Sequence, residues 1–124
     1  MKRLLPLLAL CSLSLADAHD LARDGAVGGL LHLAPDDAPV AGRATDVFVD
    51  LRQPGGKAVT LAQCVCTLSV AGPKGTRTIS LRDVAGHLSA TLIFADVGAY
   101  TLSLNGHVNA QPFVLHWVVR AAGK

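Results

Sequence analysis

The chain contains no glutamate, and each of its nine acidic residues is an aspartate. Long charged helices use glutamate freely because of its high helix propensity, so its absence argues against such helices. Aromatic residues make up only 4% of the chain, and the formal net charge is only +2. A nucleic-acid-binding surface needs clustered basic residues, so we expect no nucleic-acid partner.

Sequence motifs for catalysis are also missing. The chain has neither a G-x-S-x-G turn nor an H-E-x-x-H motif, which are typical of serine hydrolases and zinc proteases. It has no glycine-rich phosphate loop, and no pair of aspartates has a recognisable acid/base context. We therefore expect no enzymatic activity.

What the chain does have is enough apolar sequence for one domain. Its 124 residues are 51% hydrophobic and 16% charged, which is too apolar for a disordered protein and too short for two domains. No internal repeat, low-complexity segment or interdomain linker divides it. The sequence therefore predicts a single globular unit.

The first eighteen residues are organised like a signal peptide. Residues 1–3 carry the positive charge, residues 4–15 are apolar, and Ala16 and Ala18 place small side chains where signal peptidase reads them. The apolar run is shorter than the about 20 residues that span a bilayer, so no transmembrane anchor is expected. We predict a cleaved signal peptide over residues 1–18, and a periplasmic or extracellular domain over residues 19–124.

Three alternatives stay open for this segment. Cleavage after Ala16 competes with cleavage after Ala18, which would make His19 the new N-terminus. Cys11 gives a weak lipoprotein box, because the large Leu10 precedes it. A buried N-terminal helix is the remaining possibility.

From about residue 28 onward, the spacing of turn-forming residues is typical of a β protein. Apolar stretches are separated by Gly, Pro, Asp and Asn, and none has a helical period. Val47, Val49 and Leu51 alternate with Asp46 and Asp50, which gives the strand one buried and one wet face, as two packed antiparallel sheets require. The sequence predicts an all-β fold, an immunoglobulin-like antiparallel β-sandwich of about seven strands, over residues 28–34, 44–51, 60–70, 76–82, 87–94, 99–105 and 112–120.

Residues 96–102 sharpen this fold prediction. They read D-x-G-x-Y-x-L, and in immunoglobulin-like sandwiches a tyrosine at this position turns its hydroxyl back onto the preceding corner. Gly98 supplies the backbone freedom and Asp96 can bond the turn. We predict a tyrosine corner at Tyr100, with an ordinary hairpin turn as the alternative.

Cys64 and Cys66 form a C-x-C on one strand face, and three interpretations compete. An exported chain favours a disulfide, but residues two apart in a regular strand lie about 6.6 Å apart, which is long for a disulfide. Two reduced thiols would pack as small core residues. Two thiolates on one face would converge on Cu(I) or Zn.

Three histidines are candidates for the same metal. The chain start, the start of strand E and the F–G loop share one end of this fold, and His19, His87 and His107 are predicted at those places. A free amino group and imidazole on His19 would favour Cu(II), with zinc less favoured. The remaining two are not predicted ligands: His32 is expected to face outward, and His116 to be a packed or edge residue.

The chain resembles the YtkA-like family of small exported immunoglobulin-like domains in residues 39–51, 56–59 and 97–102. This resemblance implies a periplasmic or surface binding domain associated with copper transport or oxidase assembly. The neighbouring CopC-like domains begin the mature chain with a copper-binding histidine, which His19 matches. Their D-x-H segment and the methionine-rich stretches of some copper carriers are absent, since Met1 is the only methionine.

Two functions follow from these features. The first is an exported metal-binding, copper-handling domain that uses His19 and His107, with Cys64 and Cys66, or His87, contributing. The second is a protein–protein interaction module without a metal, whose sheet face or edge strand binds a membrane protein or another protein of the cell envelope.

Overall fold

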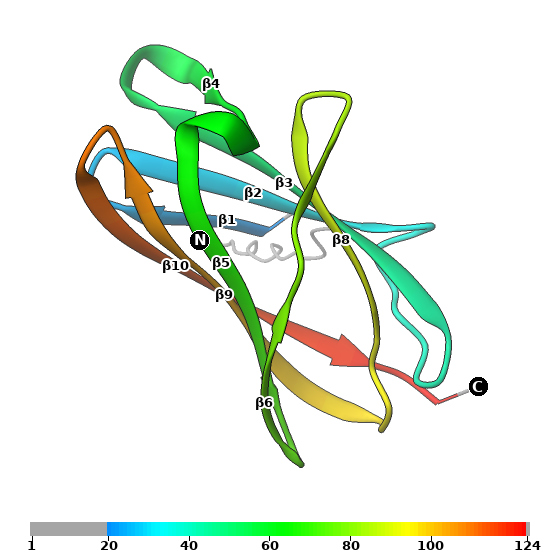
Figure 1. Ribbon diagram of the computed structural model, residues 1–124. Coiled ribbons are helices and arrows are strands. Elements are labelled where there is room, and N and C mark those ends of the chain that lie inside the picture. Colours follow the sequence, from blue (N-terminus) through cyan, green and yellow to red (C-terminus); the bar gives the residue numbers. More distant parts are fainter. Residues whose placement is uncertain (1–19, 124) are drawn as a thin grey trace, which may run out of the picture.

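The protein is a sandwich of two antiparallel β-sheets (Figure 1). The computed structural model describes residues 20–123, so the predicted signal peptide lies outside the described residues. Among the residues described, no helix is long and apolar enough to cross a membrane. The predicted all-β sandwich is confirmed. Its elements are β1 (Asp20–Asp24), β2 (Val27–Ala34), β3 (Ala44–Gln53), β4 (Lys57–Val59), β5 (Cys64–Gly72), β6 (Gly75–Ile79), β7 (Arg82–Val84), β8 (His87–Ile93), β9 (Gly98–Val108) and β10 (Gln111–Ala121), with 3-10 turns η2 (Pro54–Gly56) and η3 (Leu61–Gln63).

The strand order is that of an immunoglobulin-like sandwich. One sheet has the order β1-β2-β3-β8-β7, with β4 paired to β3, and the other has the order β10-β9-β5-β6. In immunoglobulin terms β2, β3, β8 and β7 take the places of strands A, B, E and D, while β10, β9 and β5 take those of G, F and C. The additional β1 pairs with β2 on the outer edge of the first sheet.

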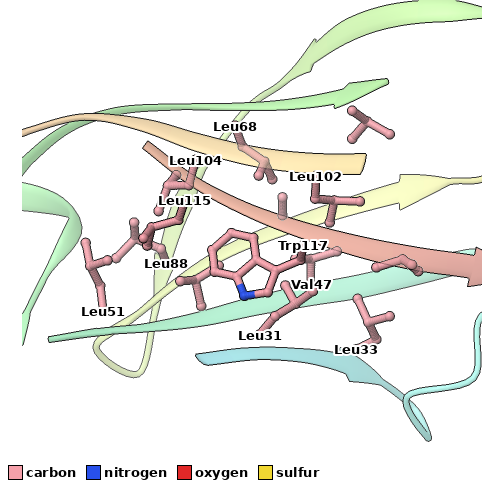
Figure 2. Close-up of a cluster of buried hydrophobic side chains, with 14 of the residues drawn as sticks. Leu31, Leu33, Val47, Leu51, Leu68, Leu88, Leu102, Leu104, Leu115 and Trp117 are labelled. Carbon is pink, nitrogen blue, oxygen red and sulfur yellow. The ribbon is translucent and has the colours of Figure 1, made fainter. Parts of the chain in front are cut away.

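Alternating residues of both sheets form one core. The inward side chains predicted for β3, β8 and β9 are buried, and so are Cys64, Leu68 and Val70 on β5. The last strand, whose facing the sequence leaves ambiguous, points Phe113, Leu115, Trp117 and Val119 inward. Figure 2 shows the Trp117 ring among core side chains of both sheets. Gly29 leaves it room, because a Cβ there would lie 2.7 Å from Leu115 Cδ1 and 3.1 Å from the Trp117 ring.

The tyrosine corner is confirmed. The Tyr100 hydroxyl donates to the carbonyl oxygen of Asp96 at 2.8 Å and accepts from the Asp96 N–H at 3.0 Å. The ring packs against Phe94, with 4.7 Å between ring centroids. It also occupies the place that a side chain at position 72 would need, which explains Gly72. The corner therefore fixes the connection between β8 and β9.

Three predicted strand boundaries are wrong. The stretch 76–82 is two strands, because the chain leaves one sheet after β6 and joins the other at β7. Residues 61–63 form η3 rather than strand, since the Thr60 N–H donates to Gln63 Oε1 at 3.0 Å in a capping box. This turn also exposes Ala62, which the sequence places on the buried face of β5.

The predicted end of a strand at residue 105 is the third error. Strand β9 continues to Val108, and the turn to β10 lies at Asn109 and Ala110, both with positive φ. Gly106 serves packing instead of turning. A Cβ there would collide with the carbonyl oxygen of Val65 and lie 2.8 Å from Cys66 Cα, so β9 and β5 approach too closely for any side chain.

Candidate functional site

The cysteine pair opens β5. The capping box of η3 ends at Gln63 and delivers the chain into β5 at Cys64, which is 6% exposed, while Cys66 is half-buried. The two residues form a disulfide, the first of the three interpretations drawn from the sequence. Their Cα atoms are 5.3 Å apart, so β5 is shorter here than the about 6.6 Å of a regular strand. In this oxidised pair neither sulfur is a thiolate that could bind a metal ion.

The cysteines and His107 lie on opposite faces of the same sheet. Cys64 pairs with Val108 and Cys66 with Gly106, while Val65, between them, pairs with His107. Because side chains alternate across a strand, Val65 and His107 point outward and the cysteines point inward. His107 is therefore not in an F–G loop as predicted, and strand alternation separates it from the two sulfurs.

The other predicted ligands do not join them. His87 is exposed at the first position of β8, in the other sheet. No group of three or more His, Cys, Asp or Glu residues within 20–123 is arranged to hold a metal ion. His19 lies outside the described residues, so its part in a copper site stays a prediction.

The sequence analysis places the chain start, the start of strand E and the F–G loop at one end of the sandwich. The structure agrees with this only in part. The Asn109 side chain donates to Gln53 Oε1 at 3.4 Å, which joins the β9–β10 turn to the end of β3. Asp20, the first described residue, instead pairs with Leu31 in the middle of β2. The predicted place of the chain start at this end is wrong for the described chain, because the additional strand β1 runs back along β2.

The two remaining histidines lie as predicted, His32 on an outward face and His116 on the edge strand β10. His32 is half-buried and pairs with Phe48 across β2 and β3. His116 is exposed on β10, and its Nδ1 lies 2.8 Å from the Ser103 hydroxyl. Both positions belong to strand surfaces rather than to a cluster of ligands.

Two hollows on the surface are lined by charged side chains. A hollow of about 400 Å³ beside the tyrosine corner contains Lys74, which pairs with Asp96 at 3.5 Å, and Arg77, which donates to the Ile93 carbonyl oxygen at 2.6 Å. A hollow of about 370 Å³ near η2 contains Arg52. The hydrogen bond and charge of Asp50 raise the pKa of Arg52 above its ordinary value. Arg23 also lines the second hollow, so only the cations of the first hollow are both engaged by groups of the protein itself.

A feature that the sequence analysis missed is the outer surface of the β10-β9-β5-β6 sheet. Its side chains are small, polar or β-branched, and only Arg120, at one corner, carries a permanent charge. We call this surface the four-stranded outer face. It consists of Val65, Thr67, Ser69 and Ala71 on β5, Thr76 and Thr78 on β6, Thr101, Ser103, Asn105 and His107 on β9, and Pro112, Val114, His116, Val118 and Arg120 on β10.

The opposite sheet surface is different. Asp46, Asp50 and Arg52 lie on the outward side of β3. Asp46 accepts a hydrogen bond from Thr91 at 2.7 Å, and Asp50 pairs with Arg52 at 2.9 Å. The alternation of Thr101, Ser103 and Asn105 was the available signal for this face. The sequence does not reveal that neighbouring strands continue the same uncharged surface, because this depends on their register.

Comparisons with known proteins add no family to this description. No protein-family model matches the chain, and no curated protein is significantly similar to it.

Proposed function

We propose that this protein is a protein–protein interaction module of the cell envelope that binds its partner through the four-stranded outer face. The observation that carries the proposal is the chemistry of that face. Val65 is 77% exposed and Val118 is 63% exposed, in a surface whose other side chains are mostly hydroxyls and small apolar groups, with one amide, two histidines and Arg120 at its corner. Depletion of charge is what distinguishes the buried centre of protein interfaces from other surface.

The energetics of this face favour a protein partner. Covering exposed valines removes apolar surface from water, which contributes about 25 cal/mol per Å². The intervening threonine and serine hydroxyls can donate and accept, so they need not lose hydrogen bonds when water leaves. No buried ion pair has to be desolvated in the middle of the contact.

The size of the face indicates the strength of the complex. Three strands spaced about 4.8 Å apart, each presenting about 20 Å of outward residues, together with the shorter β6 give a planar area of about 300 Å². A contact of this size belongs to small, transient interfaces, which bury less than about 1,200 Å² in total. We therefore expect a reversible complex rather than a permanent subunit.

The envelope location rests on the signal-peptide pattern of residues 1–18. The copper-handling alternative has less support from the described residues, because the two sulfurs are joined and His107 is on the other side of the sheet. It keeps the prediction that His19 binds Cu(II), and a direct titration separates the two functions.

Photo-crosslinking in the native host tests the proposal. A photoreactive residue replaces Val118 on the face or, as a matched control, Val97, which is 61% exposed but lies outside the two sheets in the β8–β9 connection. We expect a protein adduct of one defined mass from position 118, lost when Val65→Lys is added, and none from position 97. Equal adducts at both positions, or none at position 118, would contradict the proposal.

A copper titration of the same purified protein tests the alternative metal-binding function. Stoichiometric Cu(II) binding that disappears in His19→Ala would support the metal-binding function instead. No Cu(II) binding above background by the unmodified protein would leave the proposed interaction module as the better explanation.

A further inference from the structure

The Cys64–Cys66 disulfide is poorly suited to be a structural cross-link. It joins residues two apart in one strand, and the β5–β9 ladder already holds both of them, opposite Val108 and Gly106. A disulfide stabilises a fold mainly by closing a long loop of the unfolded chain, and this loop is nearly the shortest possible. Stabilisation of the fold therefore does not explain why this disulfide is present.

The two cysteine residues differ in their exposure to solvent. Cys64 is 6% exposed and belongs to the core cluster, while Cys66 is half-buried. The residue of β9 directly opposite Cys66 is Gly106, so the paired position places no side chain over Cys66. We therefore place the attack of a thiolate at the more exposed Cys66, with the buried Cys64 as the leaving group.

We propose that Cys64 and Cys66 form a thiol–disulfide exchange centre that oxidises a dithiol of a partner protein. One partner thiolate attacks Cys66 Sγ, the bond between the two sulfurs breaks, and Cys64 leaves as a thiolate that takes a proton from water. The second partner thiolate then attacks the partner's own sulfur in the mixed disulfide and releases Cys66. The partner loses two electrons and two protons as its disulfide forms, and Cys64 and Cys66 gain them.

The exchange is coupled by position to the four-stranded outer face. Val65 lies between the two cysteines and is the most exposed valine of that face. Without the cross-link the Cα atoms of residues 64 and 66 can move from 5.3 Å toward the about 6.6 Å of a regular strand. Reduction is therefore expected to move Val65 and its ladder partner His107. The inference does not depend on the proposed function, since the chemistry needs only an accessible Cys66.

Reduction of the folded protein by a small dithiol tests this assignment. The purified protein is incubated with dithiothreitol without denaturant, and free thiols are alkylated and assigned by peptide mass mapping, so that Cys11 is counted separately. We expect Cys64 and Cys66 to become alkylated together while circular dichroism stays that of a β-sandwich. Reduction that occurs only after unfolding would overturn the proposal.

Two single variants test the direction of attack. Cys64→Ser leaves the half-buried thiol of Cys66, and Cys66→Ser leaves the buried thiol of Cys64. We expect Cys66 in the first variant to form a mixed disulfide with an oxidised, disulfide-containing peptide, releasing one peptide thiolate, at least ten-fold faster than Cys64 in the second. Equal rates, or a faster Cys64, would contradict the assigned roles.

A surface variant separates this inference from the proposed function. Val118→Lys lies on the same face but not beside the cysteines, so it should abolish partner binding and leave the rate of reduction unchanged. Slow or absent reduction in this variant and in the unmodified protein would reject the exchange centre alone.

Discussion

Reduction of the Cys64–Cys66 disulfide is expected to lower the free energy of unfolding by less than about 2 kcal/mol. The closed loop contains three residues, counting both cysteines, and the chain-entropy relation gives about 1.6 kcal/mol for such a loop. A loop of 100 residues would give about 4.7 kcal/mol by the same relation. The release of β5 toward its regular spacing acts in the opposite direction, so about 1.6 kcal/mol is an upper value.

Urea unfolding followed by tryptophan fluorescence measures this difference. Trp117 is the only tryptophan, and at 3% exposure in the core it reports global unfolding. The midpoints with and without reductant give the change, provided that the slope m stays constant. The double variant Cys64→Ser with Cys66→Ser is the control, because reductant should not shift its midpoint. A decrease of more than about 3 kcal/mol in the free energy of unfolding is in the range of a native structural disulfide. It would refute the reasoning and show that the disulfide is a structural cross-link.

Three further substitutions follow from the packing. Tyr100→Phe removes both hydrogen bonds to Asp96 and should cost about 1–3 kcal/mol in urea unfolding; an unchanged midpoint would mean that the corner does not stabilise the fold. Gly106→Ala places a Cβ against Val65 and Cys66 and should destabilise by about 1–3 kcal/mol or more, whereas wild-type thermal stability would contradict the close approach. Ser89 is 1% exposed, and its hydroxyl lacks a hydrogen-bond partner among the described residues, so Ser89→Ala should be neutral or stabilising by up to about 1 kcal/mol; a clear loss in calorimetry would show that the hydroxyl is satisfied.

The sequence by itself determined the architecture. Hydrophobic side chains at every second position of residues 44–51 and 99–105 can be hidden from water only if each strand has one inward face. Those predicted inward residues are the buried ones. The tyrosine corner was equally local, because both hydrogen bonds of the Tyr100 hydroxyl go to Asp96.

Contacts between distant segments decided the rest. Gly106 ends no strand because β5 lies against it, forty residues away in the chain, and no local turn propensity contains that information. The same register placed His107 and the cysteines on opposite faces, since a shift of one residue along a strand reverses every side chain. Because of the additional strand β1, the chain start does not lie at the end of the sandwich where the sequence predicts it. The four-stranded outer face can be recognised only once its four strands are paired. The sequence carries the period of each strand, but pairing between strands is a property of the folded chain, and the site depends on pairing.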